Sequence, residues 1–204
     1  MEAPLYTIGI DEVGRGPLAG PLVVCACAIR HGTDVLSLFP NHQLRDSKKM
    51  TEKRRIAIGE LLPPLIMSRD IVFGIGEVSA EKIDERGLTA SIKEAMEKAL
   101  QKVHAQGVLH DSFIFLDGSL HADRSFQQET IIKGDEKIPE IALASIIAKN
   151  HRDSFMKKIS EVYPHHGFEH HVGYGTVSHY EAIKGHGLTP LHRRSFLKKL
   201  SISE

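Results

Sequence analysis

The chain contains no tryptophan, only two cysteines and no excess charge of either sign, with 26 Lys and Arg residues against 26 Asp and Glu residues in 204. Such a balanced charge does not by itself mark a nucleic-acid binder. No apolar run approaches membrane-spanning length, and residues 1–11 run directly into the first expected strand, which leaves no room for a signal peptide. We therefore expect a cytoplasmic protein that does not bind membranes.

The two cysteines, Cys25 and Cys27, lie two residues apart in the run PLVVCACAI. As strand residues at this spacing they point to the same face and are poorly placed for an unstrained disulfide, so we interpret them as core residues. The chain also lacks a Cys/His quartet at regular spacing, which argues against structural zinc.

Length and composition favour one globular domain over residues 1–204. The chain is 41% hydrophobic and 25% charged, which is ordinary for a folded domain. It contains no internal repeat, low-complexity segment or linker, and we expect a monomer.

The segment IDEVGRGPLAGP at residues 10–21 combines two adjacent carboxylates, Asp11 and Glu12, with Arg15 between Gly14 and Gly16. Carboxylate oxygens are preferred ligands of hard divalent cations, and glycine lets a backbone approach a phosphate closely. Taken alone, the segment fits almost as well a strand that ends in a solvated acidic turn.

Two later segments repeat the pattern of a β-prone run that ends in acid. SFIFLDG at 112–118 ends at Asp117 and Gly118, and ETIIKGD at 129–135 ends at Asp135. In an α/β sheet, neighbouring strands that end at one edge would gather Asp11, Glu12, Asp117 and Asp135 where such sheets usually bind ligands.

Four ionised carboxylates in one place repel one another unless cations compensate them. An oxygen-rich ligand set suits Mg²⁺ or Mn²⁺. Two such ions roughly 3.5–4 Å apart would activate a water and stabilise a leaving oxygen. This pattern predicts phosphodiester hydrolysis at a two-metal site.

Local charge is more informative than net charge. Two basic stretches could flank an acidic metal centre as phosphate clamps, although a solvated helix face is the commoner meaning of such runs. The histidine-rich segment at 164–175 is expected to form a loop with a polar, partly cationic surface. The residues concerned are Arg45, Lys48, Lys49, Lys53, Arg54 and Arg55; His192, Arg193, Arg194, Lys198 and Lys199; and His165, His166, His170 and His171.

Hydrophobic periodicity predicts alternating strands and helices. Strands are expected near 5–10, 21–29, 70–78, 112–117 and 129–133, and helices over 51–62, 89–104, 141–162 and 176–185. Thr51 should cap the first helix, and Pro63 with Pro64 should stop it. In the second helix a core-packing stripe is predicted. Its members are Ile92, Ala95, Met96, Ala99, Leu100 and Val103.

Five ordered motifs resemble those of the type 2 ribonucleases H, ribonuclease HII in particular, and together they cover nearly the whole chain. The motifs are DEVGRGPLAGP at 11–21, RDSKKMTEKRR at 45–55, FLDG at 115–118, KGDEKIPEIALASIIAKNHRD at 133–153 and GYGTVSHYEAIKGHGLTPLHRRSF at 173–196. The resemblance implies an α/β fold of the ribonuclease H type, in which helices flank a central five-stranded mixed sheet. It also implies a C-terminal helical segment, residues 165–204, that contacts substrate.

The resemblance further implies a substrate and residue roles. The substrates would be RNA/DNA hybrids and duplex DNA that contains single ribonucleotides, cut on the 5′ side of the ribonucleotide. Tyr174 would pack on the sugar at the RNA–DNA junction and help to recognise its 2′-hydroxyl. The other implied roles are metal binding by Asp11, Glu12, Asp117 and Asp135, contact with the 2′-hydroxyl and adjacent phosphate by Gly14, Arg15 and Gly16, and phosphate contact or packing of the tail by Lys48, His192 and Arg193.

Three positions depart from the family pattern: Ser119 where asparagine is common, Val172 where a lysine usually precedes GYGT, and Gly87 where asparagine is usual. None is an expected metal ligand. Residues 14–16 read GRG rather than the GTG of ribonuclease HIII, and we expect no extra N-terminal domain of the kind found in that family. Two alternatives remain open, a non-catalytic hybrid-binding module and another metal-dependent nuclease of the same fold.

Overall fold

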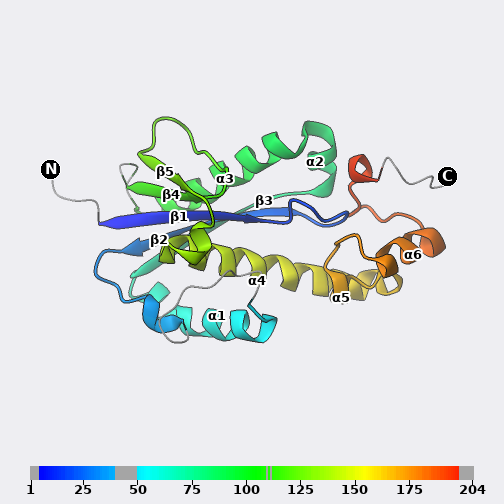
Figure 1. Cartoon of the computed structure of the whole chain (residues 1–204), viewed down its shortest axis with the longest axis horizontal. Coiled ribbons are helices and arrows are strands. Elements are labelled where there is room, and N and C mark those ends of the chain that lie inside the picture. The colour runs from blue at the N-terminus through cyan, green and yellow to red at the C-terminus, as the bar shows by residue number, and fades with distance from the viewer. Residues whose placement is uncertain (1–4, 40–49, 109, 111, 198–204) are drawn as a thin grey trace.

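The computed structural model describes residues 5–39, 50–108, 110 and 112–197, and within them the chain forms one five-stranded mixed sheet (Figure 1). The strand order is β3-β2-β1-β4-β5. The strands are β1 (Tyr6–Val13), β2 (Leu22–Arg30), β3 (Ile71–Val78), β4 (Phe113–Asp117) and β5 (Gln128–Ile131). β1, β2 and β3 pair antiparallel, whereas β4 and β5 continue the sheet in parallel with β1. The predicted α/β fold with a mixed five-stranded sheet is confirmed.

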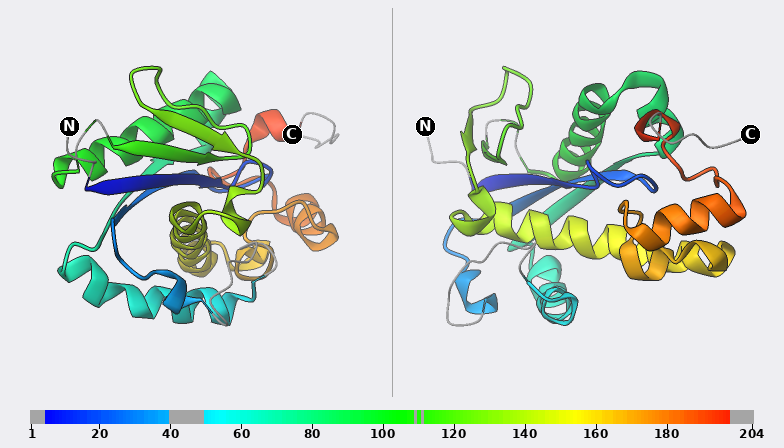
Figure 2. Two further views of the ribbon diagram at one scale, coloured as in Figure 1. Left: turned by 60° about the vertical axis from the view of Figure 1, so that its left-hand side comes forward. Right: turned by 45° about the vertical axis from the view of Figure 1, so that its right-hand side comes forward.

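Helices cover both faces of the sheet (Figures 1 and 2). On one face lie α2 (Ala80–Arg86) and α3 (Leu88–Ala105), and on the other α4 (Pro139–Val162), with α1 (Glu52–Met67) packed outside it. The short α5 (Phe168–His171) and α6 (Val177–His186) follow α4. No helix within the described ranges is long and apolar enough to cross a membrane.

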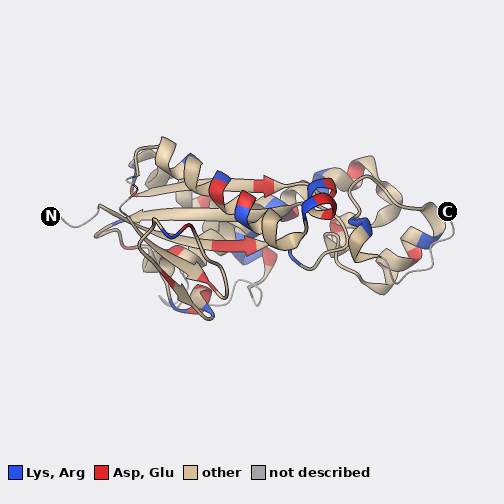
Figure 3. Ribbon diagram, turned by 90° about the horizontal axis from the view of Figure 1, so that it is seen from above, with Lys and Arg blue, Asp and Glu red and all other residues tan. Residues whose placement is uncertain are grey.

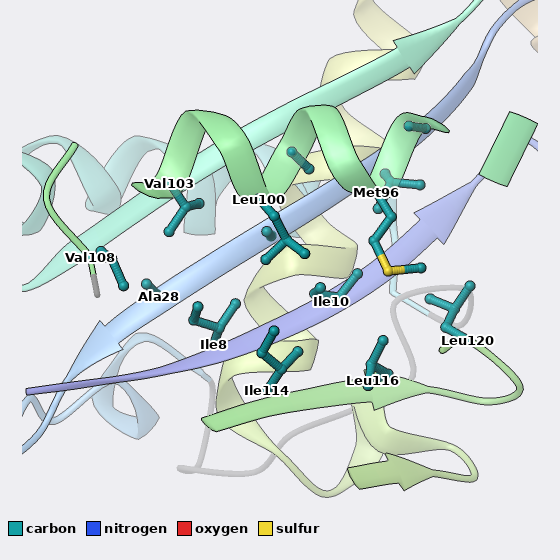
Figure 4. Close-up of a cluster of buried hydrophobic side chains, with 14 of the residues drawn as sticks. Ile8, Ile10, Ala28, Met96, Leu100, Val103, Val108, Ile114, Leu116 and Leu120 are labelled. Atoms are coloured by element: carbon teal, nitrogen blue, oxygen red, sulfur yellow. The ribbon is translucent and has the colours of Figure 1, made fainter. Parts of the chain in front are cut away.

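Alternation along the central strands divides the core into two clusters. Ile8 and Ile10 of β1 point toward α3, where they meet Met96 and Leu100 of the predicted helical stripe (Figure 4). Alternate residues of β2, including Cys25 and Cys27, point toward α1 and α4 instead. Both thiols are fully buried, and burial raises their pKa. The interpretation of both cysteines as core residues is confirmed.

At Gly9 the backbone of β1 touches the start of α4 with no side chain between them. A Cβ atom at Gly9 would lie 2.1 Å from the carbonyl carbon of Glu140 and 2.3 Å from the backbone nitrogen of Ile141, closer than any real contact. Gly76 of β3 has the same role toward α3, since its Cβ would lie 1.8 Å from the carbonyl oxygen of Ala95. Both helices therefore pack directly on the sheet backbone.

The structure corrects the predicted end of α1, which continues through Pro63 and Pro64 to Met67. The two prolines remove backbone donors, but Leu62 is buried on this helix, and Leu65 and Ile66 pack against the same core cluster. Tertiary packing therefore outweighs the helix-stopping tendency of proline. The predicted cap is confirmed, because the Thr51 hydroxyl accepts the N–H of Arg54.

Helix α2 was not predicted from the sequence. Its signals were present, because the Ser79 hydroxyl caps it by accepting the N–H of Lys82 and Gly87 ends it with a φ of +80°. The helix has only seven residues, which is too short for a clear helical period.

Replacing Gly9 with alanine should destabilise the fold by roughly 3 kcal/mol or more, because the new methyl group must push α4 away from β1. Gly185→Ala is the control, since its Cβ would meet nothing within 4 Å and alanine favours the helix in which it lies. Urea denaturation checks both variants, and similar midpoints for the two would contradict this role of Gly9.

Candidate active site

Asp11 and Glu12 lie near the end of β1, where the strand approaches α4. Asp11 is buried, and its Oδ1 accepts the N–H of Glu12 at 2.7 Å. A side-chain hydrogen bond joins Asp11 to Ser145 of α4. Burial, followed by the charges of Glu12 and Asp117, raises the pKa of Asp11 to about 8. The carboxyl therefore lies where added positive charge would be strongly favourable.

Of the other two predicted acids, Asp117 ends the neighbouring strand β4 and Asp135 lies in the turn that follows β5. Parallel pairing sets Ile10 beside Leu116, so β4 brings Asp117 to the same edge of the sheet. The Oδ1 of Asp117 accepts the N–H of Gly134 at 2.7 Å. Asp135 follows in the 3-10 helix Gly134–Glu136 and is buried, rather than ending a strand as expected, because β5 stops at Ile131.

A cavity of about 140 Å³ opens beside Asp11 and Glu12. It brings acids from β1, a glycine-rich loop, one face of α4 and the exposed tyrosine that follows α5 into one site. Its lining consists of Asp11, Glu12, Val13, Gly14, Arg15, Gly16, Ser145, Lys149 and Tyr174. Two segments predicted to contact substrate, 14–16 and the GYGT turn, therefore line the same cavity although they are about 160 positions apart in the chain.

The two glycines of the loop differ in what surrounds them. Gly14 has a φ of +89°, and its Cβ would lie 2.6 Å from the Nε of Arg152, so this glycine is required by the fold. Gly16 is exposed, and its Cβ would meet nothing within 4 Å. The space beside Gly16 is therefore open to solvent rather than filled by the protein.

Three residues of α4 that were not predicted as site residues contribute to this region, Ser145 and Lys149 by lining the cavity and Arg152 by holding the loop that follows β1. Ser145, Lys149 and Arg152 follow at spacings of four and three, which places them on one face of the helix. Lys149 has its Nζ 2.7 Å from Asp153 and 6.0 Å from the ring centre of Tyr174. Burial lowers the pKa of Lys149. The signal was Ser145, a polar residue within the apolar run 141–148 that aligns with Lys149 and Arg152 only at helical spacing.

Several predicted phosphate contacts prove to be internal. Arg55 is buried and forms an ion pair with Asp153 at 3.0 Å, so it packs α1 against α4. The side chains of His192 and Arg193 are buried and bond other parts of the protein, which makes direct phosphate contact by them wrong and favours the predicted packing role. Lys53, Arg54 and Arg194 are exposed, whereas Arg45, Lys48, Lys49, Lys198 and Lys199 lie outside the described residues.

The expectation of a cationic histidine surface is also wrong for half of its members. His165 and His170 are exposed, but His166 and His171 are buried around Phe168, and burial lowers the pKa of His171. The segment forms two short helical turns rather than an open loop. In the view of Figure 3, Lys and Arg are interspersed with Asp and Glu along the described ribbon.

The carboxyl set fits a divalent cation. Within the described ranges, no group of three or more His, Cys, Asp or Glu side chains is arranged to hold a metal ion by itself. Mg²⁺ commonly binds through one or two carboxylates and completes its shell with waters and substrate oxygens. Burial is the largest cause of the raised pKa of Asp11, and the charges of Glu12 and Asp117 raise it further, so a nearby cation would favour the ionised carboxylate.

Comparisons with known proteins agree on one family. A family model described as Ribonuclease HII matches residues 8–199. A protein named Ribonuclease HII from Chlamydia caviae is 43% identical over 188 residues, which cover 92% of this chain and 82% of that protein. One of the same name from Clostridioides difficile is 40% identical over 196 residues, covering 96% and 71%. The solved RNase HII structure from a PCNA:RNase HII complex of Archaeoglobus fulgidus is 25% identical, with a TM-score of 0.72 and 98% of each chain covered.

Replacing Asp11 with asparagine should stabilise the metal-free protein at pH 8, by on the order of 1–3 kcal/mol. An aspartate in the unfolded chain ionises near pH 3.8, whereas Asp11 in the folded protein does so near pH 8. Below pH 3.8 the carboxyl is protonated in both states, so the raised pKa does not change the free energy of unfolding there. As the pH rises from 3.8 toward 8, the unfolded chain ionises first and the free energy of unfolding falls. Thermal melting in chelator checks this, and a lower melting temperature for Asp11→Asn than for the unsubstituted protein would contradict it.

The same melting experiment should show that metal stabilises the unsubstituted protein. A ligand that binds only the folded state at ten times its Kd contributes about 1.4 kcal/mol. Mg²⁺ or Mn²⁺ should therefore raise the melting temperature, and the rise should shrink in Asp11→Asn. Buffer that contains chelator and no added metal is the reference. Equal rises in melting temperature for the unsubstituted protein and Asp11→Asn would show that the ion does not bind at Asp11.

Proposed function

Since the chain belongs to the ribonuclease HII family and is therefore a metal-dependent endoribonuclease, we propose that it cuts duplex DNA on the 5′ side of single embedded ribonucleotides and also cuts the RNA strand of RNA/DNA hybrids. The observation that supports this specificity is the shared cavity, in which the acids of β1 face both the Gly14–Gly16 loop and Tyr174. The proposed role is removal of ribonucleotides from DNA during replication and repair.

Asp11, Glu12, Asp117 and Asp135 would hold the metal ions, with Mg²⁺ or Mn²⁺ the expected choice. When bound, the ions supply an activated water and compensate charge on the leaving oxygen. The water oxygen bonds to phosphorus as the bond from phosphorus to the 3′ oxygen breaks. The products are a 3′-hydroxyl on the DNA and a 5′-phosphate on the ribonucleotide. Ser145 keeps Asp11 oriented through their side-chain hydrogen bond.

The Gly14–Gly16 loop and Tyr174, which line the same cavity as the acids of β1, would recognise the ribose. Gly16 leaves room for a phosphate or sugar to reach the loop backbone. The Nη1 of Arg15 lies 3.0 Å from the Oε1 of Glu12, so the arginine is held beside the acids while its side chain stays exposed. Tyr174 is 41% exposed and offers an apolar ring with a hydroxyl tip, which suits a sugar that carries a 2′-hydroxyl.

Cleavage of labelled duplexes with zero, one or several ribonucleotides tests the proposal, with Mg²⁺, Mn²⁺ or chelator. The single-ribonucleotide duplex should be cut once, on its 5′ side, and end-labelling should show a 3′-hydroxyl. Asp117→Asn should lose nearly all turnover while remaining folded, because it removes a charge and a ligand but keeps an oxygen that can accept the Gly134 N–H.

Three results would contradict parts of the proposal. Cleavage of the all-DNA duplex would favour another nuclease of this fold, and tight hybrid binding without cleavage would favour a non-catalytic module. Full turnover by Asp117→Asn would remove this residue from the metal site.

Replacing Tyr174 with alanine should reduce cleavage at a single ribonucleotide more than cleavage of a long hybrid. A long hybrid offers many 2′-hydroxyls and many binding registers, whereas a single ribonucleotide offers one. Loss of one hydrogen bond and one packing contact should cost on the order of 1–3 kcal/mol on the single site. The kcat/KM ratio for the two substrates is the measurement, with Tyr174→Phe separating hydroxyl from ring, and an unchanged ratio would sink this role.

A further inference from the structure

His192 and Arg193 are neighbours in the chain whose buried side chains reach two different walls of the cavity. Each is at most 3% exposed. The guanidinium of Arg193 donates to the carbonyl oxygen of Gly20 from Nε at 3.1 Å and from Nη2 at 2.8 Å, and to that of Arg15 from Nη1 at 3.1 Å. Among the described residues it forms no ion pair, so backbone carbonyls supply the hydrogen bonds to this buried charge, and its Cζ also lies 5.2 Å from the ring centre of Phe196.

The hydrogen bond from Arg193 fixes the peptide between Arg15 and Gly16. In a trans peptide the C=O and N–H groups point in opposite directions. Because the carbonyl of Arg15 points inward to Arg193, the N–H of Gly16 points away from the guanidinium, on the exposed side of the loop that borders the cavity. A cationic partner on the carbonyl also polarises that N–H as a donor.

His192 reaches the other wall through His179 of α6. The Nδ1 of His179 lies 2.9 Å from the carbonyl oxygen of Tyr174, which can only accept, so Nδ1 carries the hydrogen. The Nε2 of His179 must then accept from the Nε2 of His192 at 3.1 Å. The Nδ1 of His192 in turn accepts the N–H of Thr189 at 2.9 Å. Every hydrogen in this chain of bonds therefore has one assigned direction.

This series of hydrogen bonds requires that the imidazoles of His179 and His192 are both neutral. Burial lowers the pKa of His179 and of His192 to about 4. His171 stacks on His179 with ring centres 4.2 Å apart, which fixes the plane of the ring that donates to Tyr174. The carbonyl of Tyr174 also accepts the N–H of Thr176 at 2.8 Å, so its backbone has two fixed donors.

We propose that His192 and Arg193 are positioning residues that jointly set the two substrate-reading walls, Arg193 by orienting the Arg15–Gly16 peptide and His192 by holding Tyr174 through His179. This inference rests on the proposed function. Backbone contacts already attach this part of the chain to the loop, because the N–H of Arg193 donates to Leu18 and His192 bridges Ala19. The side chains are thus available for setting geometry.

Two replacements of His179 separate positioning from stability. An asparagine amide nitrogen can take the place of Nδ1 and keep a donor to Tyr174, whereas a glutamine amide reaches the place of Nε2 and meets only His192. Each variant loses one buried hydrogen bond, so both should melt at similarly lowered temperatures. His186→Gln, at an exposed histidine on the same helix, is the control.

Cleavage of a single-ribonucleotide duplex should then distinguish the two variants. We expect His179→Gln to lower kcat roughly three- to tenfold with little change in KM, and His179→Asn to stay within about twofold of the unsubstituted protein. Affinity for the same duplex, measured by fluorescence anisotropy in chelator, should follow the same order. Equal losses in the two variants would show that His179 only stabilises the fold and would overturn the proposal.

A double-mutant cycle tests whether the effect passes through Tyr174. His179→Gln should add little to Tyr174→Ala, because the ring whose position it sets is already gone. Multiplicative losses would overturn the assignment.

The role of Arg193 at the Arg15–Gly16 wall is tested separately with Arg193→Lys. Lysine keeps the charge but cannot donate to two carbonyls in a fixed plane. We therefore expect kcat to fall at least tenfold on both the single-ribonucleotide duplex and the long hybrid, at temperatures where the variant is folded. Normal kcat in Arg193→Lys would overturn that half.

Failure of the proposed function gives a different result from failure of this inference. If neither the unsubstituted protein nor His186→Gln cuts the ribonucleotide-containing duplex, the proposed function is wrong and this inference falls with it. If both cut and the His179 pair behaves alike, only the positioning role is wrong.

Discussion

The direct contact of β1 with α4 at Gly9 is the constraint on which the site depends. Because no side chain separates the two backbones there, this contact fixes both the distance between α4 and β1 and the rotation of α4 about its own axis. That rotation turns Ser145, Lys149 and Arg152 toward the end of β1. Ser145 then bonds Asp11, Lys149 lines the cavity, and Arg152 donates to the carbonyls of Ala19, Pro21 and Val172. One helix face thus serves the acids and both loops.

The charged residues that shape the site are distinguished by being buried, not by an excess of one sign of charge. Arg152 and Arg193 are fully buried, and each is surrounded by carbonyl oxygens of the loop that follows β1. A buried cation is costly unless it is well hydrogen-bonded, so these arginines hold the loop only in the conformation that satisfies them. Asp11, Asp135 and Asp153 are buried as well, and the zero net charge of the sequence gives no sign of either group of buried charges.

Strand periodicity was enough to predict much of the site, because it locates where each strand ends and therefore which acids lie at the same end of the sheet. Asp11 and Asp117 end neighbouring strands, and their approach followed from the expected sheet. The position of Asp135 in a 3-10 turn did not, since that turn is set by the bond from Gly134 to Asp117. Nor could sequence show that His192 and Arg193 are buried. A basic residue in a tail has the same local pattern whether it faces water or carbonyls, and only the long-range packing of residues 15–20 against 191–193 decides.

The buried thiols of β2 give the protein a built-in chemical reporter. Thiol reagents attack the thiolate, and burial both hides Cys25 and Cys27 and keeps them protonated. Their strand is paired on both edges, with β1 on one side and β3 on the other, and α4 covers their face. Modification by a reagent must therefore wait for the sheet to separate from α4, so its rate follows the opening of the part of the fold that carries the acids, without any label being introduced.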